Sequence, residues 1–252
     1  MKNLLMNPID EMCGNILKYY SINEYKSIRE FAENDIDLSG DVSSEKSHID
    51  LNFTPYLIEP LSFSVIEPGV RKVVTFSAPE QMGKTTLEIV AILYNVTYQK
   101  KIQAIVAYPS LDLAIETSHT KFVPLFRRIP QFAADIDNPF AIRSDRLKLS
   151  NALIYWQGGG VKIVSKSCKL TVADECAVYS TPNNVNNLEE LIKRTRSYNE
   201  CLSLFVSTPS FQENAFWQKF LEGSQGYFHL RCLRCGKRSI RSCDIHNLHV
   251  LS

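Results

Sequence analysis

Eight consecutive residues carry the clearest chemical signal in the chain. They are Ala78, Pro79, Glu80, Gln81, Met82, Gly83, Lys84 and Thr85. The octet matches the phosphate-binding loop G-x-x-x-x-G-K-[ST], except that alanine replaces the first glycine. In such a loop the backbone N–H groups surround a β-phosphate, the lysine reaches the β and γ oxygens, and the hydroxyl holds Mg²⁺. We therefore expect ATP and Mg²⁺ to bind at Lys84, Thr85 and the following Thr86, although an ordinary strand-to-helix turn would also fit the octet alone.

A pair of carboxylates follows a second apolar run. Residues 169–173 read Lys-Leu-Thr-Val-Ala, and Asp174 and Glu175 come directly after them. Because parallel strands end at the ligand edge of a sheet, Asp174 is placed to hold the water shell of Mg²⁺, and Glu175 to orient and deprotonate an attacking water. A glutamate beside the metal-binding aspartate favours hydrolysis over phosphoryl transfer to a small acceptor. Two solvated acids after a strand are the alternative, which the upstream loop disfavours.

The elements that position these groups alternate between strands and helices. Apolar β-rich runs predict strands at 73–76, 102–108, 169–175 and 202–206, and helical periodicity predicts helices at 86–94, 111–126 and 188–198. Residues 152–156 and 161–164 flank Gly158, Gly159 and Gly160 and predict a hairpin. Strands separated by helices indicate an α/β fold, a P-loop NTPase of the RecA/ASCE-like kind, with a mostly parallel sheet flanked by helices.

Charge and composition divide the chain into three parts. Residues 1–50 hold ten acids against five bases, so we expect an N-terminal arm and linker over 1–52, with weak helical periodicity from Pro8 to Phe31. The ATPase domain is expected over 53–226. A basic Cys/His tail is expected over 227–252, as a short Cys-rich appendage in which five Arg and Lys residues face phosphate or solvent.

That tail contains two closely spaced pairs of metal-ligand types. They are Cys232 with Cys235, and Cys243 with His246. Three thiolates and an imidazole suit tetrahedral Zn²⁺, and free thiols are the alternative. The remaining cysteines, at 13, 168, 176 and 201, are expected to be small buried hydrophobes.

The sequence also indicates the cellular compartment of the protein. No apolar run approaches the roughly 20 residues that span a bilayer, and the N-terminus lacks the layout of a secretory signal. The seven cysteines are an odd number, which favours reduced thiols or metal ligands over disulfides. We therefore expect a cytoplasmic protein with no membrane partner, while the net charge of +1 indicates no particular class of partner.

The order of these motifs resembles the large terminase subunit of tailed bacteriophages, in its lambda-like branch. The resemblance rests on Pro55-Tyr56, Gln81 before Gly83-Lys84-Thr85, Tyr108-Pro109-Ser110, Asp174-Glu175, Ser207-Thr208-Pro209, and the aromatic and C-x-x-C-G stretch from 226 to 236. It spans residues 55–236.

This resemblance implies an ATPase motor that drives double-stranded DNA into a procapsid through its portal. It further implies a small terminase subunit as partner and a homo-oligomer as the active form. Lys84 and Glu175 would be catalytic, and Thr208 would belong to a coupling motif that senses the γ-phosphate. An arginine from a neighbouring copy would stabilise charge on the transferring phosphoryl group. Arg194 and Arg196 are the nearest candidates, the family's pattern favours Arg194, and a solvated basic helix face is the alternative for either.

Two departures from the family leave other functions open. The loop between Gly160 and Asp174 is shorter than usual, and the sequence ends at Ser252 before any nuclease domain, so it offers no support for cutting. A truncated chain, a split subunit and a prophage remnant are equally consistent with that end. The alternatives are another P-loop enzyme, a helicase-like ATPase or small-molecule kinase, and a non-catalytic remnant. Glu175 argues against a kinase, and no room remains for the second domain of a helicase.

Overall fold

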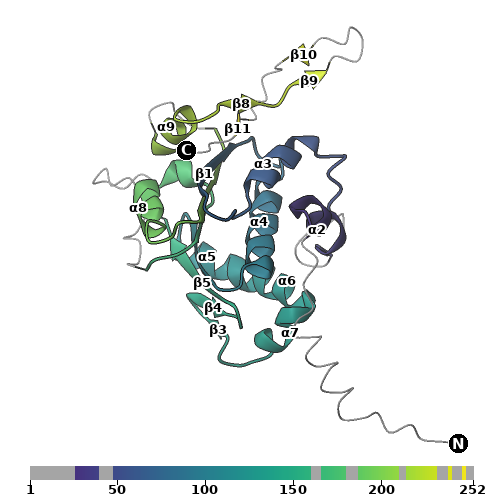
Figure 1. Ribbon diagram of the computed structural model, residues 1–252, viewed down its shortest axis with the longest axis vertical. Coiled ribbons are helices and arrows are strands. Elements are labelled where there is room, and N and C mark those ends of the chain that lie inside the picture. Colours follow the sequence, from purple (N-terminus) through teal and green to yellow (C-terminus); the bar gives the residue numbers. More distant parts are fainter. Residues whose placement is uncertain are drawn as a thin grey trace, which may run out of the picture.

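The computed structural model describes residues 26–39, 48–159, 166–179, 187–209, 214–231, 238–239 and 246–247. Within them, one large sheet lies between two layers of helices (Figure 1). Its strand order is β3-β4-β5-β2-β6-β7-β1-β11-β8, and β9 and β10 form a separate pair. The predicted α/β class with a mostly parallel sheet is confirmed.

Five long strands form the parallel centre of the sheet. They are β1 (Arg71–Ser77), β2 (Ile102–Tyr108), β5 (Ala152–Gly158), β6 (Leu170–Ala173) and β7 (Cys201–Ser207). Strand β7 lies between β1 and β6 and pairs in parallel with both. Their carboxyl ends therefore meet at one edge, which brings the segments after β1, β6 and β7 together.

Short antiparallel strands extend both sides of this centre. They are β3 (Ile142–Arg143), β4 (Arg146–Lys148), β8 (Gly226–Tyr227) and β11 (His246–Asn247), and β9 (Leu230–Arg231) and β10 (Arg238–Ser239) form the separate pair. Strand β5 has β4 and β2 as its described neighbours. The partner predicted for it, residues 161–164, lies outside the described residues.

Helices cover both faces of the sheet because alternate strand residues point to opposite sides. One face carries α2 (Ile28–Asn34), η1 (Pro55–Leu57), α3 (Ile58–Phe63), α4 (Lys84–Tyr98), α5 (Leu111–Thr117), η2 (Ser118–Phe122), α6 (Val123–Arg128) and α7 (Pro130–Ile136). The other carries η3 (Cys176–Val178), α8 (Asn187–Arg194) and α9 (Ala215–Leu221). The predicted helix over 111–126 is present but contains a π-helical turn at η2, and the predicted helix over 188–198 ends at Arg194.

The N-terminal part differs from the arm that the sequence predicts. Helix α2 opens with a capping box between Ser27 and Glu30, and its inner face is buried. Phe31 meets Tyr94 edge-to-face at 5.5 Å, and the Tyr94 hydroxyl donates to the Lys26 carbonyl at 2.8 Å. Residues 26–39 thus pack against α4 as part of the domain core.

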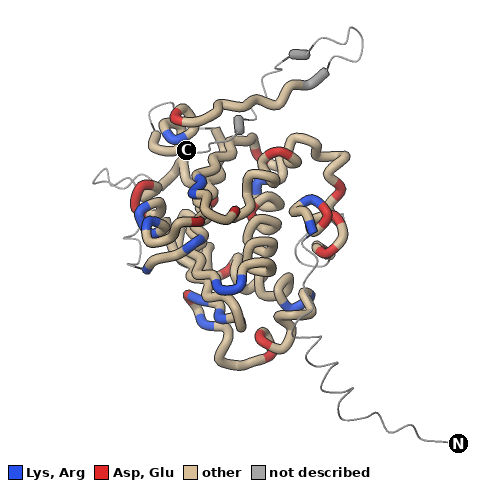
Figure 2. Tube along the Cα trace, in the orientation of Figure 1, with Lys and Arg blue, Asp and Glu red and all other residues tan. Residues whose placement is uncertain are grey.

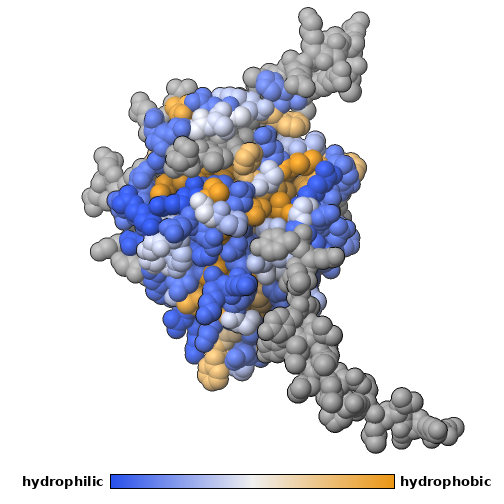
Figure 3. All heavy atoms as spheres, in the orientation of Figure 1, coloured by the Kyte–Doolittle hydropathy of each residue, from blue (hydrophilic) through white to orange (hydrophobic). Residues whose placement is uncertain are grey.

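The described surface is mixed in charge. Acidic and basic positions alternate over the helices and loops (Figure 2), and hydrophilic residues cover most of the face in Figure 3, with an apolar band across its upper half. Among the described helices, none combines the length and apolarity needed to cross a bilayer. Cys168, Cys176 and Cys201 are buried free thiols, as predicted, and burial raises the pKa of Cys168 to about 12.

Candidate active site at the carboxyl edge of the sheet

The phosphate-binding loop leaves the sheet at the end of β1. The Ala78 N–H donates to the Ser207 carbonyl at 3.1 Å, so the loop starts beside the end of β7. Ala78 is fully buried, and its backbone is not among the described residues with positive φ. The conformation here does not require glycine, which explains why alanine is tolerated at the first position of the pattern.

The turn into α4 does require special backbone geometry. Gly83 has φ of 73° and ψ of 20°, a left-handed conformation that favours glycine. A Cβ at this position would lie 2.8 Å from Cδ1 of Leu57, so the space is also closed. Gln81 has φ of 60° without being glycine, which is a strained conformation of the kind found at functional sites.

Lys84 is the first residue of α4, and its ammonium group is nearly buried. Its Nζ donates to the carbonyls of Ala78 and Pro79, each at 3.2 Å, and to Oγ1 of Thr208 at 2.8 Å. It also lies 3.5 Å from Oε1 of Glu175. The structure therefore brings the predicted lysine, glutamate and threonine together, although 124 residues separate Lys84 from Thr208.

Glu175 joins the acidic strand to the end of β7. It adopts a left-handed conformation with φ of 46°, which turns its side chain toward Thr208. Its Oε2 accepts from the Thr208 N–H at 3.3 Å, and its Oε1 accepts from Thr208 Oγ1 at 3.2 Å. The Ser207 hydroxyl lies 3.5 Å from Oε2. Thr208 Oγ1 is thus shared between the lysine and the glutamate.

Asp174 points to the other side of the sheet edge, toward α4. Burial is the main cause that raises the pKa of its carboxyl group, and the neighbouring Glu175 raises it further. It accepts from the Glu175 N–H at 2.8 Å. Next to it lie the Glu88 carboxyl on α4 and the Tyr108 hydroxyl at the end of β2, both buried.

Glu88 on α4 also lies at this edge and was not among the predicted site residues. Burial raises the pKa of its carboxyl well above the ordinary value, and the adjacent Asp174 adds to this. Although Glu88 lies against Asp174 and Tyr108, neither of its oxygens meets a hydrogen-bond partner in good geometry among the described residues. The signal was present in the sequence, since Glu88 is an acid in an otherwise apolar stretch of helix, three residues after Thr85.

The oxygen groups at this edge suit Mg²⁺. Mg²⁺ is usually held by one or two protein oxygens together with phosphate and water oxygens. Thr85 is the second residue of α4 and Asp174 directly follows β6, so one hydroxyl and one carboxylate come from two elements that meet at this edge. Within the described stretches, no group of three or more His, Cys, Asp or Glu side chains is placed to hold a metal without such help.

Two predicted groups do not join this site. Arg194 ends α8, where its Nη2 lies 3.4 Å from Glu190 and its carbonyl accepts from the Cys168 N–H at 3.0 Å. Cys168 precedes β6, so Arg194 lies at the amino edge of the sheet, opposite Lys84. The zinc prediction at Cys232, Cys235 and Cys243 falls outside the described residues, as does the side chain of His246.

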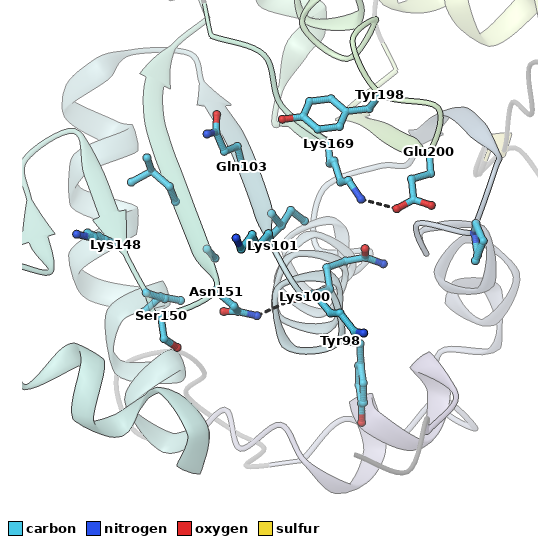
Figure 4. A pocket seen from close by; sticks show the side chains of 16 residues that line it. Tyr98, Lys100, Lys101, Gln103, Lys148, Ser150, Asn151, Lys169, Tyr198 and Glu200 are labelled. Carbon is cyan, nitrogen blue, oxygen red and sulfur yellow. Dashed lines mark hydrogen bonds and ion pairs between the residues drawn. The ribbon is translucent and has the colours of Figure 1, made fainter. Parts of the chain in front are cut away.

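A cavity of about 1040 Å³ lies at that amino edge, away from the loop (Figure 4). Its lysines are Lys100, Lys101, Lys148 and Lys169, and Lys169 is ion-paired with Glu200. Figure 4 shows these side chains around the start of β2 and the turn before β5. None of the residues of the phosphate loop lines this cavity, so it is separate from the site at the carboxyl edge.

Comparison with known proteins agrees with this geometry. The model of the phage terminase large subunit gpA ATPase domain family matches residues 43–248. No curated protein matches the chain in sequence.

Two solved structures that resemble this chain are both phage large terminases. The large terminase of bacteriophage HK97 is similar with a TM-score of 0.58 and 13% identity, over 79% of this chain and 40% of that one. The large terminase ATPase domain of Thermus phage P74-26 is similar with a TM-score of 0.43 and 18% identity, over 69% of this chain and 73% of that one. The HK97 structure shows a shared fold, and this chain spans 40% of its length.

Proposed function

Because the chain belongs to the phage terminase large subunit gpA ATPase domain family, we propose that it is the ATP-hydrolysing motor domain that drives double-stranded DNA into a procapsid. The family confirms the resemblance seen in the sequence. The observation that carries the proposal is the meeting of Lys84, Glu175 and Thr208 at one edge of the sheet, with Lys84 Nζ 2.8 Å from Thr208 Oγ1 and 3.5 Å from Glu175 Oε1.

Each side chain has a role that its position supports. Lys84 would bind the β and γ phosphates, and Glu175 would orient the attacking water and accept its proton. Thr85 and Asp174 would hold Mg²⁺, which supplies positive charge to the phosphate oxygens when bound. Hydrolysis is favoured over transfer because the carboxylate of Glu175 lies beside the phosphate loop.

Thr208 is placed to couple the chemistry to movement. Its hydroxyl accepts a hydrogen bond from Lys84 and donates one to Glu175. A bound phosphate that accepts a hydrogen bond from Lys84 would therefore compete with the Thr208 hydroxyl for that lysine. Because Thr208 directly follows β7, a change at its hydroxyl acts on the end of a strand that pairs with both β1 and β6. This is the arrangement expected of a residue that reports the state of the γ-phosphate.

The decisive experiment is ATP turnover with and without linear duplex DNA and a small terminase subunit. A motor should hydrolyse ATP faster when DNA is present, and Lys84→Ala should abolish both rates. An ATP turnover rate that DNA leaves unchanged would favour another P-loop ATPase. Nucleotide binding without turnover would favour a non-catalytic remnant. The portal of the procapsid and the host cytoplasm are the partner and location that this function implies.

The arginine contribution is expected to come from a second copy of the chain. Arg194 is at the opposite sheet edge from Lys84, so it can reach a phosphate site only across an oligomer contact. We expect turnover per chain to rise with protein concentration, and Arg194→Ala to lower the assembled rate by roughly 10³-fold. Arg196→Ala, two residues away on an exposed position, should leave the rate near that of the parent.

A mixing experiment separates this role from a local one. Arg194→Ala chains have an intact Lys84, and Lys84→Ala chains have an intact Arg194. If the arginine acts between copies, mixing the two inactive variants restores part of the activity. A dilute monomer as fast as the assembly, or a mixture that stays inactive, contradicts the assignment.

A structural zinc is proposed for the C-terminal tail on its sequence spacing. We expect one Zn²⁺ per chain, bound by Cys232, Cys235, Cys243 and His246, because a tail with few apolar residues gains order from a metal. Metal analysis of protein purified without chelator measures this directly. Less than about a tenth of an equivalent, or a zinc content unchanged by Cys232→Ser, would indicate ordinary reduced cysteines.

A further inference from the structure

Glu88 is an ionisable residue in an environment that does not explain it. It has no exposed surface, and neither carboxyl oxygen has a hydrogen-bond partner in good geometry among the described residues, although the Asp174 carboxyl lies beside it. A buried carboxyl group costs folding free energy as a charge without a partner and also as a neutral acid with unpaired oxygens, whereas leucine would cost far less. Lys121 is the cation whose field acts on it, but no hydrogen bond joins the two. Folding alone therefore gives no reason for an acid at this position.

The position of Glu88 on α4 directs it toward the metal site. Thr85 and Glu88 are three residues apart and share one face of the helix. Side chains on a helix tilt toward its N-terminus, so the Glu88 carboxyl extends back in the direction of Thr85. On the sheet side it meets Asp174, which follows β6 and faces the same helix. The Glu88 carboxyl thus contacts Asp174 and extends toward Thr85, the two predicted magnesium ligands.

We propose that Glu88 is a positioning residue of the magnesium site, whose carboxylate accepts a hydrogen bond from a metal-bound water and fixes the place of Asp174. Water molecules on Mg²⁺ are strong donors, and Mg²⁺ keeps several of them when it binds. A bound water supplies the donor that both Glu88 oxygens lack. Groups that support a metal ligand in this way commonly change metal affinity by 10–100-fold when removed.

This inference rests on the proposed ATPase function, and the experiment separates the two. A fluorescent ADP analogue is titrated into the full chain in EDTA and again in saturating MgCl₂. In the parent we expect Mg²⁺ to tighten nucleotide binding. In Glu88→Gln the affinity in EDTA should match the parent, while the gain from Mg²⁺ should fall by roughly tenfold. Electron paramagnetic resonance of Mn²⁺ bound to the protein–ADP complex should show a similar loss of metal affinity.

Thermal unfolding without nucleotide distinguishes positioning from structural support. Glu88→Gln replaces a buried carboxyl group that has no well-placed partner by an amide of the same shape, so its melting temperature should be close to that of the parent. Glu88→Asp keeps a carboxyl group on a shorter side chain and should recover part of the Mg²⁺ effect. Glu116→Gln, an exposed acid on α5, is the matched control and should behave as the parent.

Each outcome decides the inference. If Glu88→Gln retains the full Mg²⁺ effect, the positioning role is wrong. If it melts at a lower temperature and weakens nucleotide binding equally in EDTA and in MgCl₂, Glu88 supports the fold instead. If the parent itself binds no nucleotide, the proposed function fails and the Glu88 role fails with it, a result that is visible before any variant is compared.

Discussion

Replacing Lys84 by alanine is expected to abolish ATP binding and turnover together. The ammonium group is held at the start of α4 beside the phosphate loop, where it donates to the carbonyls of Ala78 and Pro79. A hydrogen bond to a charged group is worth about 1.5–3 kcal/mol, so the loss of two bonds to phosphate should weaken ATP binding by at least about 100-fold. Titration of a fluorescent ATP analogue measures the binding, and phosphate release measures the turnover.

Lys101→Ala provides the control for this variant. Lys101 lies in the cavity at the opposite sheet edge, so the same loss of charge should leave nucleotide affinity unchanged. Unfolding of both variants by heat checks that the domain stays intact. If Lys84→Ala binds ATP as tightly as the parent, the octet is an ordinary turn and the assignment of the loop is wrong.

Glu175→Gln is expected to separate binding from chemistry. Glutamine keeps the shape of the side chain but cannot accept a proton from water, so turnover should fall by roughly 10²-fold or more while Mg·ATP still binds. One oxygen remains to accept from the Thr208 hydroxyl, so the link to β7 is only partly weakened. Single-turnover measurements with saturating ATP report the chemical step directly.

Glu116→Gln is the matched control, because Glu116 is an exposed acid on α5, outside the phosphate loop. It should leave turnover within about twofold of the parent, since it contacts neither Lys84 nor Thr208 among the described interactions. Equal losses of ATP binding in Glu175→Gln and Lys84→Ala would contradict the role of base, and would make Glu175 a group that shapes the pocket.

The strands and the phosphate loop could be predicted from the sequence because each is marked by a short run of consecutive residues. The strand predicted at 102–108 matches β2 residue for residue, and β7 differs from its prediction by one residue at each end. Runs of β-branched and aromatic residues define buried parallel strands without reference to partners. The site followed from the strands, since their carboxyl ends meet at one edge.

Other features depended on contacts that a single sequence does not display. Helix α2 forms because Phe31 packs against α4, a tertiary contact with residues more than sixty positions away. Strands β3 and β4 are two and three residues long and rich in arginine, too short to show a period. Glu88 on α4 was missed because its neighbours are distant in sequence: Asp174 follows β6 and Tyr108 ends β2. Only the fold brings their carboxyl and hydroxyl groups against it.

If the threonine shared by Lys84 and Glu175 has the proposed coupling role, nucleotide affinity and the position of the end of β7 belong to one linked equilibrium. Linkage is reciprocal: if nucleotide shifts the end of β7 by some factor in its equilibrium constant, then any load that shifts β7 changes nucleotide affinity by the same factor. A force or partner that keeps Thr208 on Glu175 would thereby change nucleotide affinity without touching the phosphate loop. Under the proposed coupling role, resistance on the strand would in this way set how tightly the next ATP binds.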